Sequence, residues 1–103
     1  MSTAPKTFPN VKQVTVSFEN GMPSVDPEPI EIWSTKNESV EWVAEPRDLA
    51  FTICFAAESP FSERHFHEHR PASGPIKTGA TGRYKYTIEV NGVILDPGVI
   101  IRP

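Results

Sequence analysis

The stretch GRYKYTIEVNGVIL, residues 82–95, decides the fold class of this protein. Its aromatic and apolar residues Tyr84, Tyr86, Ile88 and Val90 alternate with arginine, lysine, threonine and glutamate. A period of two predicts a β-strand that buries one face. The Asn-Gly pair that follows is typical of a tight turn between two antiparallel strands. The stretch therefore predicts a β-hairpin whose tyrosines belong to the core.

The same alternation recurs at 11–18, 38–44 and 49–56, and shorter apolar segments lie at 30–32 and 99–101. The segment 49–56 has large apolar residues on one face and small or neutral residues on the other, so we expect both faces to be partly covered. Eleven prolines and six glycines interrupt the chain and leave little room for long helices. We predict an all-β fold, an antiparallel Greek-key β-sandwich of seven or eight short strands.

The chain has 103 residues, which suits one domain. Residues 1–10 carry two prolines and no pattern, so we expect a loose lead-in, followed by a sandwich domain over 11–103. The segment 59–75 breaks the alternation. Ser59 followed by Pro60 resembles the beginning of a helix, and this segment is predicted to be a short helix or an irregular excursion.

Charge and composition exclude several classes of partner. The net charge of −3 is mildly acidic and argues weakly against nucleic acid, which needs a basic face. No apolar run approaches the roughly 20 residues that a membrane helix needs. The first ten residues lack the layout of a secretory signal, so a cytoplasmic location is expected. Because Cys54 is the only cysteine, the chain has no internal disulfide and no four-cysteine zinc site.

The order of these segments resembles that of the cupredoxins, the small blue-copper β-sandwiches. The resemblance rests on Val40-Glu41-Trp42, on FTICF at 51–55 and on GRYKY at 82–86, and it spans roughly residues 11–102. It implies a cupredoxin-like sandwich with a long excursion between two core strands. The family takes one copper-ligating histidine from a place that here falls near Phe51. It takes its copper-ligating cysteine from a place near Ile88.

The blue-copper ligands themselves are missing from this sequence. The segment TIEVNGVILDPG, residues 87–98, contains no cysteine, histidine or methionine. A blue-copper centre needs one thiolate and two imidazoles. The resemblance therefore implies a cupredoxin-like domain without type 1 copper and without electron transfer.

All three histidines lie in RHFHEHR, residues 64–70. In an extended chain His65, His67 and His69 share one face, and in a helix His65 and His69 align. Either geometry brings imidazoles together, and imidazole is a common ligand of copper, nickel and zinc. The three histidines are therefore a candidate metal site, with weak binding of these ions expected in vitro.

Two other interpretations of RHFHEHR stay open. In the first the segment is a solvated polar loop, in which Arg64 and Arg70 pair with Glu63 and Glu68. In the second it is a pH sensor, since protonation near pH ~6 places several positive charges side by side. Beyond the histidines, Cys54 is expected to be a small core or sheet residue rather than a redox thiol.

No catalytic motif stands out in the sequence, since it has no glycine-rich phosphate loop, G-x-S-x-G elbow or H-E-x-x-H. The first functional hypothesis is a non-catalytic binding module whose partner is another protein or a second copy paired through an edge strand. It predicts an exposed apolar patch that includes Trp33, Phe61 or Phe66. The second is a metal-binding protein that uses the three histidines, with Glu63 or Glu68 in reach. An enzyme ranks third.

Overall fold

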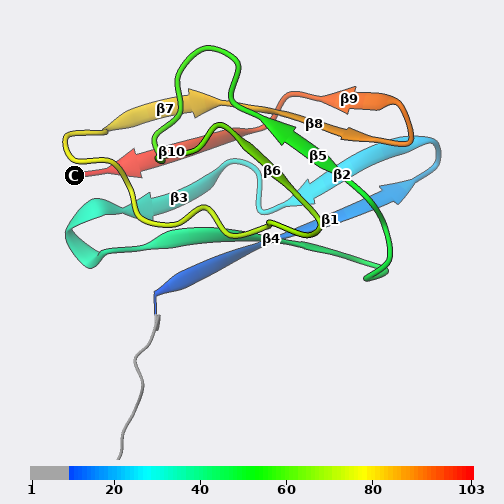
Figure 1. Ribbon diagram of the computed structural model, residues 1–103, viewed down its shortest axis with the longest axis horizontal. Coiled ribbons are helices and arrows are strands. Elements are labelled where there is room, and N and C mark those ends of the chain that lie inside the picture. Colours follow the sequence, from blue (N-terminus) through cyan, green and yellow to red (C-terminus); the bar gives the residue numbers. More distant parts are fainter. Residues whose placement is uncertain (1–9) are drawn as a thin grey trace, which may run out of the picture.

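In the computed structural model, which describes residues 10–103, short strands form three sheets in a sandwich-like, all-β arrangement (Figure 1). The predicted lead-in lies, apart from Asn10, outside the described residues. The strands are β1 (Val11–Glu19), β2 (Met22–Asp26), β3 (Ile30–Trp33), β4 (Ser39–Ala44), β5 (Thr52–Cys54), β6 (His65–His67), β7 (Gly82–Lys85), β8 (Thr87–Val90), β9 (Val93–Leu95) and β10 (Gly98–Arg102), with a 3₁₀ helix, η1, at Ser34–Lys36.

The first sheet has the strand order β2-β1-β4, the second β3-β10-β7 and the third β6-β5-β8-β9. Our prediction of purely antiparallel sheets is wrong in two places, because β1 pairs with β4 and β3 pairs with β10 in parallel. The chain path explains the first pair. After β2 the chain continues as β3 into the second sheet, turns through η1, and re-enters the first sheet as β4, in the direction of β1.

Ten strands are present among residues 10–103 where seven or eight were predicted, because two long stretches are each divided between sheets and the excursion contributes the additional strand β6. The stretch 82–90 is one run of chain (gold to orange in Figure 1), but β7 pairs with β10 while β8 pairs with β5 and β9. At the division the backbone N–H of Tyr86 donates to the carbonyl of Pro97 (3.1 Å). Pro27 and Pro29 lie between β2 and β3, where the chain leaves the first sheet for the second, and neither proline has a backbone N–H to donate to a ladder.

The predicted Asn-Gly turn after residue 90 is confirmed, and a second Asn-Gly turn follows β1. Asn20 and Gly21 have φ values of 54° and 78°, and Asn91 and Gly92 have 51° and 80°. Two successive residues with positive φ make the turn whose twist matches that of the flanking strands, and asparagine and glycine tolerate this region best. These turns connect β1 to β2 and β8 to β9.

The molecule measures 19 Å along its shortest axis. This thickness fits two stacked sheets whose backbones lie about 10 Å apart, with the core between them. The predicted buried face of 82–90 is confirmed from Tyr86 onward. Five aromatic side chains contact one another in the middle of the core: Trp42, Phe55, Phe61, Phe66 and Tyr86. This cluster links the first sheet to the third.

The prediction for 49–56 is half right. Phe51, Ile53 and Phe55 are buried as expected, but Thr52 and Ala56 on the other face are exposed. The reason is that β5 lies in the third sheet, whose outer face is open to solvent at several positions: Thr52, His65, Glu89 and Ile94. Only the inner face of this sheet is packed against the core.

The excursion at 59–75 contains no helix. It consists of a loop, strand β6 and a segment that leads back to the first sheet. Ser59 caps a turn rather than a helix, since its Oγ accepts the N–H of Phe61 (3.1 Å) and donates to the carbonyl of Glu63 (2.7 Å). Past β6 the chain reaches the first sheet, where Trp42 N–H donates to the Pro71 carbonyl and Ser73 N–H to the Val40 carbonyl. The excursion therefore joins the third sheet to the first.

Candidate functional site

The three histidines follow one another at alternate positions, but His65 contacts Cys54 whereas His67 and His69 contact each other. His65 lies opposite Cys54 in the antiparallel pair of β5 and β6, and the Sγ of Cys54 is 3.4 Å from Nε2 of His65. The adjacent opposed pair, Phe55 and Arg64, carries a backbone hydrogen bond (2.8 Å). In an antiparallel ladder, hydrogen-bonded pairs of residues alternate with non-hydrogen-bonded pairs, and the side chains are closer in the latter. Cys54 and His65, next to the hydrogen-bonded pair, therefore form a non-hydrogen-bonded pair.

His67 closes the turn that follows β6. Its backbone exchanges hydrogen bonds with Arg70 (3.3 and 2.9 Å), and its Nδ1 accepts the backbone N–H of His69 (3.2 Å). An Nδ1 that accepts a hydrogen bond carries no proton, so neutral His67 has its proton on Nε2. In this conformation neither ring nitrogen of His67 is free to bind a metal ion.

His69 lies at the tip of the turn, with 83% of its side chain exposed. Its Nε2 is 3.8 Å from a carboxylate oxygen of Glu68, and its ring centroid is 6.0 Å from that of His67. The other carboxylate oxygen of Glu68 accepts the backbone N–H of Phe51 (3.1 Å). The turn residues are thus held to the segment before β5 through Glu68.

Among residues 10–103 no three histidine, cysteine, aspartate or glutamate side chains are placed to hold one metal ion. The structure brings His65 to Cys54 and His67 to His69, but it does not bring the three imidazoles to one point. A metal site at all three histidines, and pH sensing by them, stay predictions.

The sequence reasoning missed the contact between Cys54 and His65. We expected Cys54 to be a small core or sheet residue, and its side chain is indeed half-buried on the outer face of the third sheet. The alternation already placed Cys54 on the face opposite Phe51, Ile53 and Phe55. What the sequence lacked was the register that sets position 54 against position 65.

Two details of the polar-loop and apolar-patch predictions are corrected. Arg64 does not pair with Glu63; its Nη1 donates to the carbonyls of Phe55, Ala56 and Ala57 (3.4, 3.1 and 3.1 Å). Phe61 and Phe66 are buried in the core, so they cannot belong to an exposed patch. Trp33 is exposed as predicted, with Lys36 Nζ 5.3 Å from its ring centroid.

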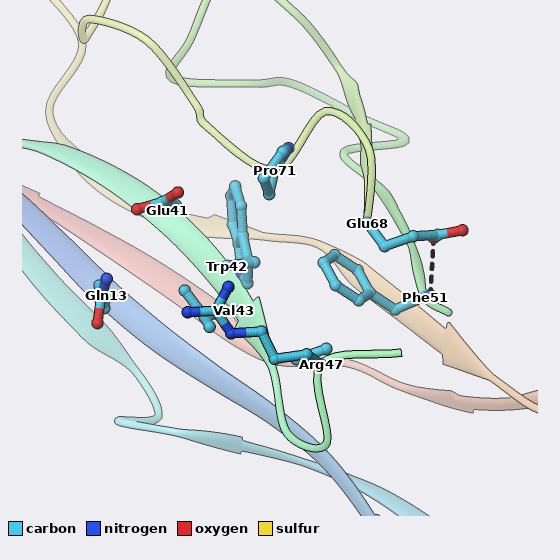
Figure 2. Close-up of a pocket in the computed structure, with 9 residues that line it drawn as sticks. Gln13, Glu41, Trp42, Val43, Arg47, Phe51, Glu68 and Pro71 are labelled. Atoms are coloured by element: carbon cyan, nitrogen blue, oxygen red, sulfur yellow. Dashed lines mark hydrogen bonds between the residues drawn. The ribbon is translucent and has the colours of Figure 1, made fainter. Parts of the chain in front are cut away.

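A groove of about 250 Å³ lies where the turn after β6 meets β4 (Figure 2). Its lining is Gln13, Glu41, Trp42, Val43, Ala44, Arg47, Phe51, Glu68 and Pro71. Figure 2 shows Trp42 and Phe51 between the side chains of Glu41 and Glu68. Since both aromatic side chains are almost fully buried, the part of the groove that faces solvent is mostly polar.

The charges around this groove differ in how firmly they are held. Hydrogen bonds from the backbone N–H groups of Glu68 itself and of Phe51 hold the pKa of the Glu68 carboxyl below its usual range. Within the described part of the chain, neither Glu41 nor Arg47 forms an ion pair. The groove therefore offers the fixed carboxylate of Glu68, the unpaired carboxylate of Glu41 and the unpaired guanidinium of Arg47.

Comparison of the chain with protein-family models, with curated proteins and with solved structures finds no match in any of the three. Function therefore has to be argued from the geometry. No helix within residues 10–103 has the length and apolar character needed to cross a membrane.

Proposed function

We propose that this protein is a non-catalytic, cupredoxin-like binding module without a blue-copper redox site, located in the cytoplasm, and that it binds a protein partner at the groove of Figure 2. The observation that carries the proposal is the pair of unpaired opposite charges, Glu41 and Arg47, beside a rigid aromatic floor. These two charges complement a polar peptide segment that carries one positive and one negative charge.

The size of the groove favours a partner's side chain over an enclosed small molecule. Sites that enclose small ligands have volumes of about 300–1,000 Å³ and bury most of the ligand surface. This groove, at about 250 Å³, is smaller and open on one side. It has room for one or two side chains of a peptide segment, whose remaining surface would lie on the protein around it.

The floor of the groove is rigid, which favours binding. Trp42 belongs to β4, whose backbone is held on one side by β1 and on the other by Pro71 and Ser73. Phe51 is held by the hydrogen bond from its N–H to Glu68. A rigid site loses little conformational freedom when a ligand binds.

The experiment that tests this proposal is an array of short peptides probed with the labelled protein and with charge-reversal variants. Peptides bound by the wild-type protein are expected to lose binding to Glu41→Lys and to Arg47→Glu. Glu45→Lys and Arg70→Glu are the matched controls, because they make the same charge changes at exposed positions that do not line the groove. Equal loss in the controls, or no captured peptide that distinguishes Arg47→Glu from the wild type, would contradict the proposal.

Self-association is the second form that a partner can take. The edge strands β2 and β9 carry the exposed apolar residues Met22 and Ile94, which are 49% and 59% exposed. An edge strand with apolar side chains favours pairing with a second copy. Sedimentation equilibrium of the wild type and of Ile94→Lys separates this outcome from a peptide partner.

The alternative function is metal binding by the histidine segment 65–69, with copper, nickel or zinc as the ion. One observation favours it, namely that His65 lies beside a second donor atom, the sulfur of Cys54. Calorimetric titration of the wild type and of a variant with all three histidines changed to alanine tests this alternative directly.

A further inference from the structure

The geometry points to a thiolate–imidazole site for a divalent ion such as Zn²⁺, formed by Cys54 Sγ and His65 Nε2 on the open face of the third sheet. It uses one histidine of the segment together with a residue outside it, and none of the residues that line the groove. It therefore differs from the three-histidine site in its ligands and is independent of the peptide-binding proposal.

The distance between the two donor atoms matches the bite of a tetrahedral ion. Zinc–sulfur bonds are about 2.3 Å long and zinc–imidazole bonds are about 2.0–2.1 Å long. Across the observed 3.4 Å separation, these bond lengths give an S–Zn–N angle of about 100°, near the tetrahedral value. When the ion binds, the thiol proton of Cys54 passes to solvent, so that the sulfur binds as a thiolate and the imidazole binds through the lone pair of Nε2.

Both donors are positioned by the backbone rather than by flexible loops. Cys54 is the last residue of β5 and His65 the first of β6, and the register places them directly opposite each other. On its other side Cys54 faces Thr87 of β8, whose hydroxyl donates to the Cys54 carbonyl (3.4 Å). Because β5 is paired on both sides and β6 is paired with β5, the Cys54–His65 pair needs little rearrangement when an ion binds.

The two donors are also reachable from solvent. His65 is exposed and Cys54 is half-buried, and both lie on the face of the third sheet that no other layer covers. The remaining two positions of a tetrahedral ion are then open to water or to a donor from an incoming molecule. Zinc accepts sulfur and imidazole ligands together, which suits this pair better than ions that prefer oxygen.

His67 is excluded from this site by its own hydrogen bond. Its Nδ1 accepts the N–H of His69, which leaves the proton on Nε2. A histidine that binds a metal through Nε2 needs the opposite arrangement, with Nδ1 as the donor. His65 has no such constraint, because its Nε2 already faces the sulfur.

The test uses the full chain with its thiol reduced and Co²⁺ as an optical probe that stands in for Zn²⁺. Thiolate binding to cobalt produces a ligand-to-metal charge-transfer band, and the visible bands report a tetrahedral ion. We expect a saturable one-to-one titration with both signals, and displacement of cobalt by zinc. Cys54→Ser and His65→Ala are expected to lose the charge-transfer band or the titration, and to bind zinc at least about 100-fold more weakly, because even partners beyond the ligands cost 10–100-fold.

His69→Ala is the matched control, since it also removes one imidazole from the segment but none from the pair. It should keep the charge-transfer band and the affinity of the wild type. Circular dichroism and thermal melting of each variant confirm that the fold is retained. The site is overturned if the wild type shows no charge-transfer band, if Cys54→Ser binds as tightly as the wild type, or if binding is lost in His69→Ala.

Discussion

The indole Nε1 of Trp42 donates a hydrogen bond to the hydroxyl of Tyr86 across the core (3.1 Å). The two residues are only 1% and 2% exposed. Trp42 belongs to the first sheet, and Tyr86 stands at the point where one stretch of chain passes from the second sheet to the third. Every buried side-chain nitrogen and oxygen atom in residues 10–103 has a hydrogen-bond partner, and this bond satisfies the buried polar atoms of Trp42 and Tyr86.

Replacing Tyr86 with phenylalanine should destabilise the protein by about 1–3 kcal/mol, because it leaves the buried N–H of Trp42 without an acceptor. The ring is kept, so the aromatic packing against Phe55 and Trp42 changes little. Urea unfolding followed by tryptophan fluorescence measures the change. Tyr84→Phe removes the hydroxyl of a half-buried tyrosine in the same stretch and is expected to change stability by no more than about 0.5 kcal/mol. Equal effects of the two substitutions would contradict the role assigned to the Trp42–Tyr86 bond.

The same tyrosine makes the protein sensitive to alkali. Burial, which disfavours the phenolate, raises the pKa of Tyr86 to about 12 from 10.0. A folded-state pKa above the unfolded one gives stability that is fully present below pH 10 and is lost as pH rises toward 12. The loss should reach roughly 2–3 kcal/mol, and Tyr86→Phe should show a correspondingly flatter decline of the unfolding free energy. Parallel declines in the two proteins over this pH range would contradict the assignment.

Ser73 is expected to be the strongest single polar tie between the excursion and the first sheet. Its buried hydroxyl accepts the N–H of Val40 (2.9 Å) and donates to the carbonyl of Gly74 (2.8 Å). Ser73→Ala leaves the Val40 N–H unpaired and should cost about 1–3 kcal/mol. Hydrogen exchange of the Val40 amide should accelerate more than exchange within β8. Ser24→Ala, at an exposed position of β2, is the control and should change neither quantity.

The local elements were predictable because each one depends on residues close in sequence. The alternation at 82–90 and 49–56 located the alternate residues that are buried: Tyr86, Ile88, Val90, Phe51, Ile53 and Phe55. The two Asn-Gly pairs located their turns. Such signals arise from the periodicity of a strand and from the φ values that asparagine and glycine tolerate.

The division of long stretches between sheets was not predictable in the same way. Tyr86 keeps the alternation, so nothing local marks the place where its N–H turns away to Pro97. The pairing of Cys54 with His65 likewise depends on the register of β5 against β6, which is set by the loop between them and by the core contacts of Phe66. Long-range register is decided by packing, and a single sequence records it only indirectly.

The carboxylate of Glu68 should make a small, pH-dependent contribution to stability that Glu68→Gln removes. Because the folded-state pKa is lowered by the backbone N–H groups of Glu68 and Phe51, the contribution is present above the ordinary pKa of 4.5 and is lost as pH falls through the lowered value. Glutamine keeps an oxygen for the Phe51 N–H but no charge, so the cost at neutral pH should be below about 1 kcal/mol.

The wild type and Glu68→Gln should therefore differ in unfolding free energy at neutral pH and converge in acid, as measured by urea unfolding at several pH values. Glu58→Gln removes an exposed carboxylate that does not line the groove and serves as the control. A difference between the wild type and Glu68→Gln that stays constant down to strongly acidic pH would show that the charge of Glu68 does not hold the turn after β6 to Phe51.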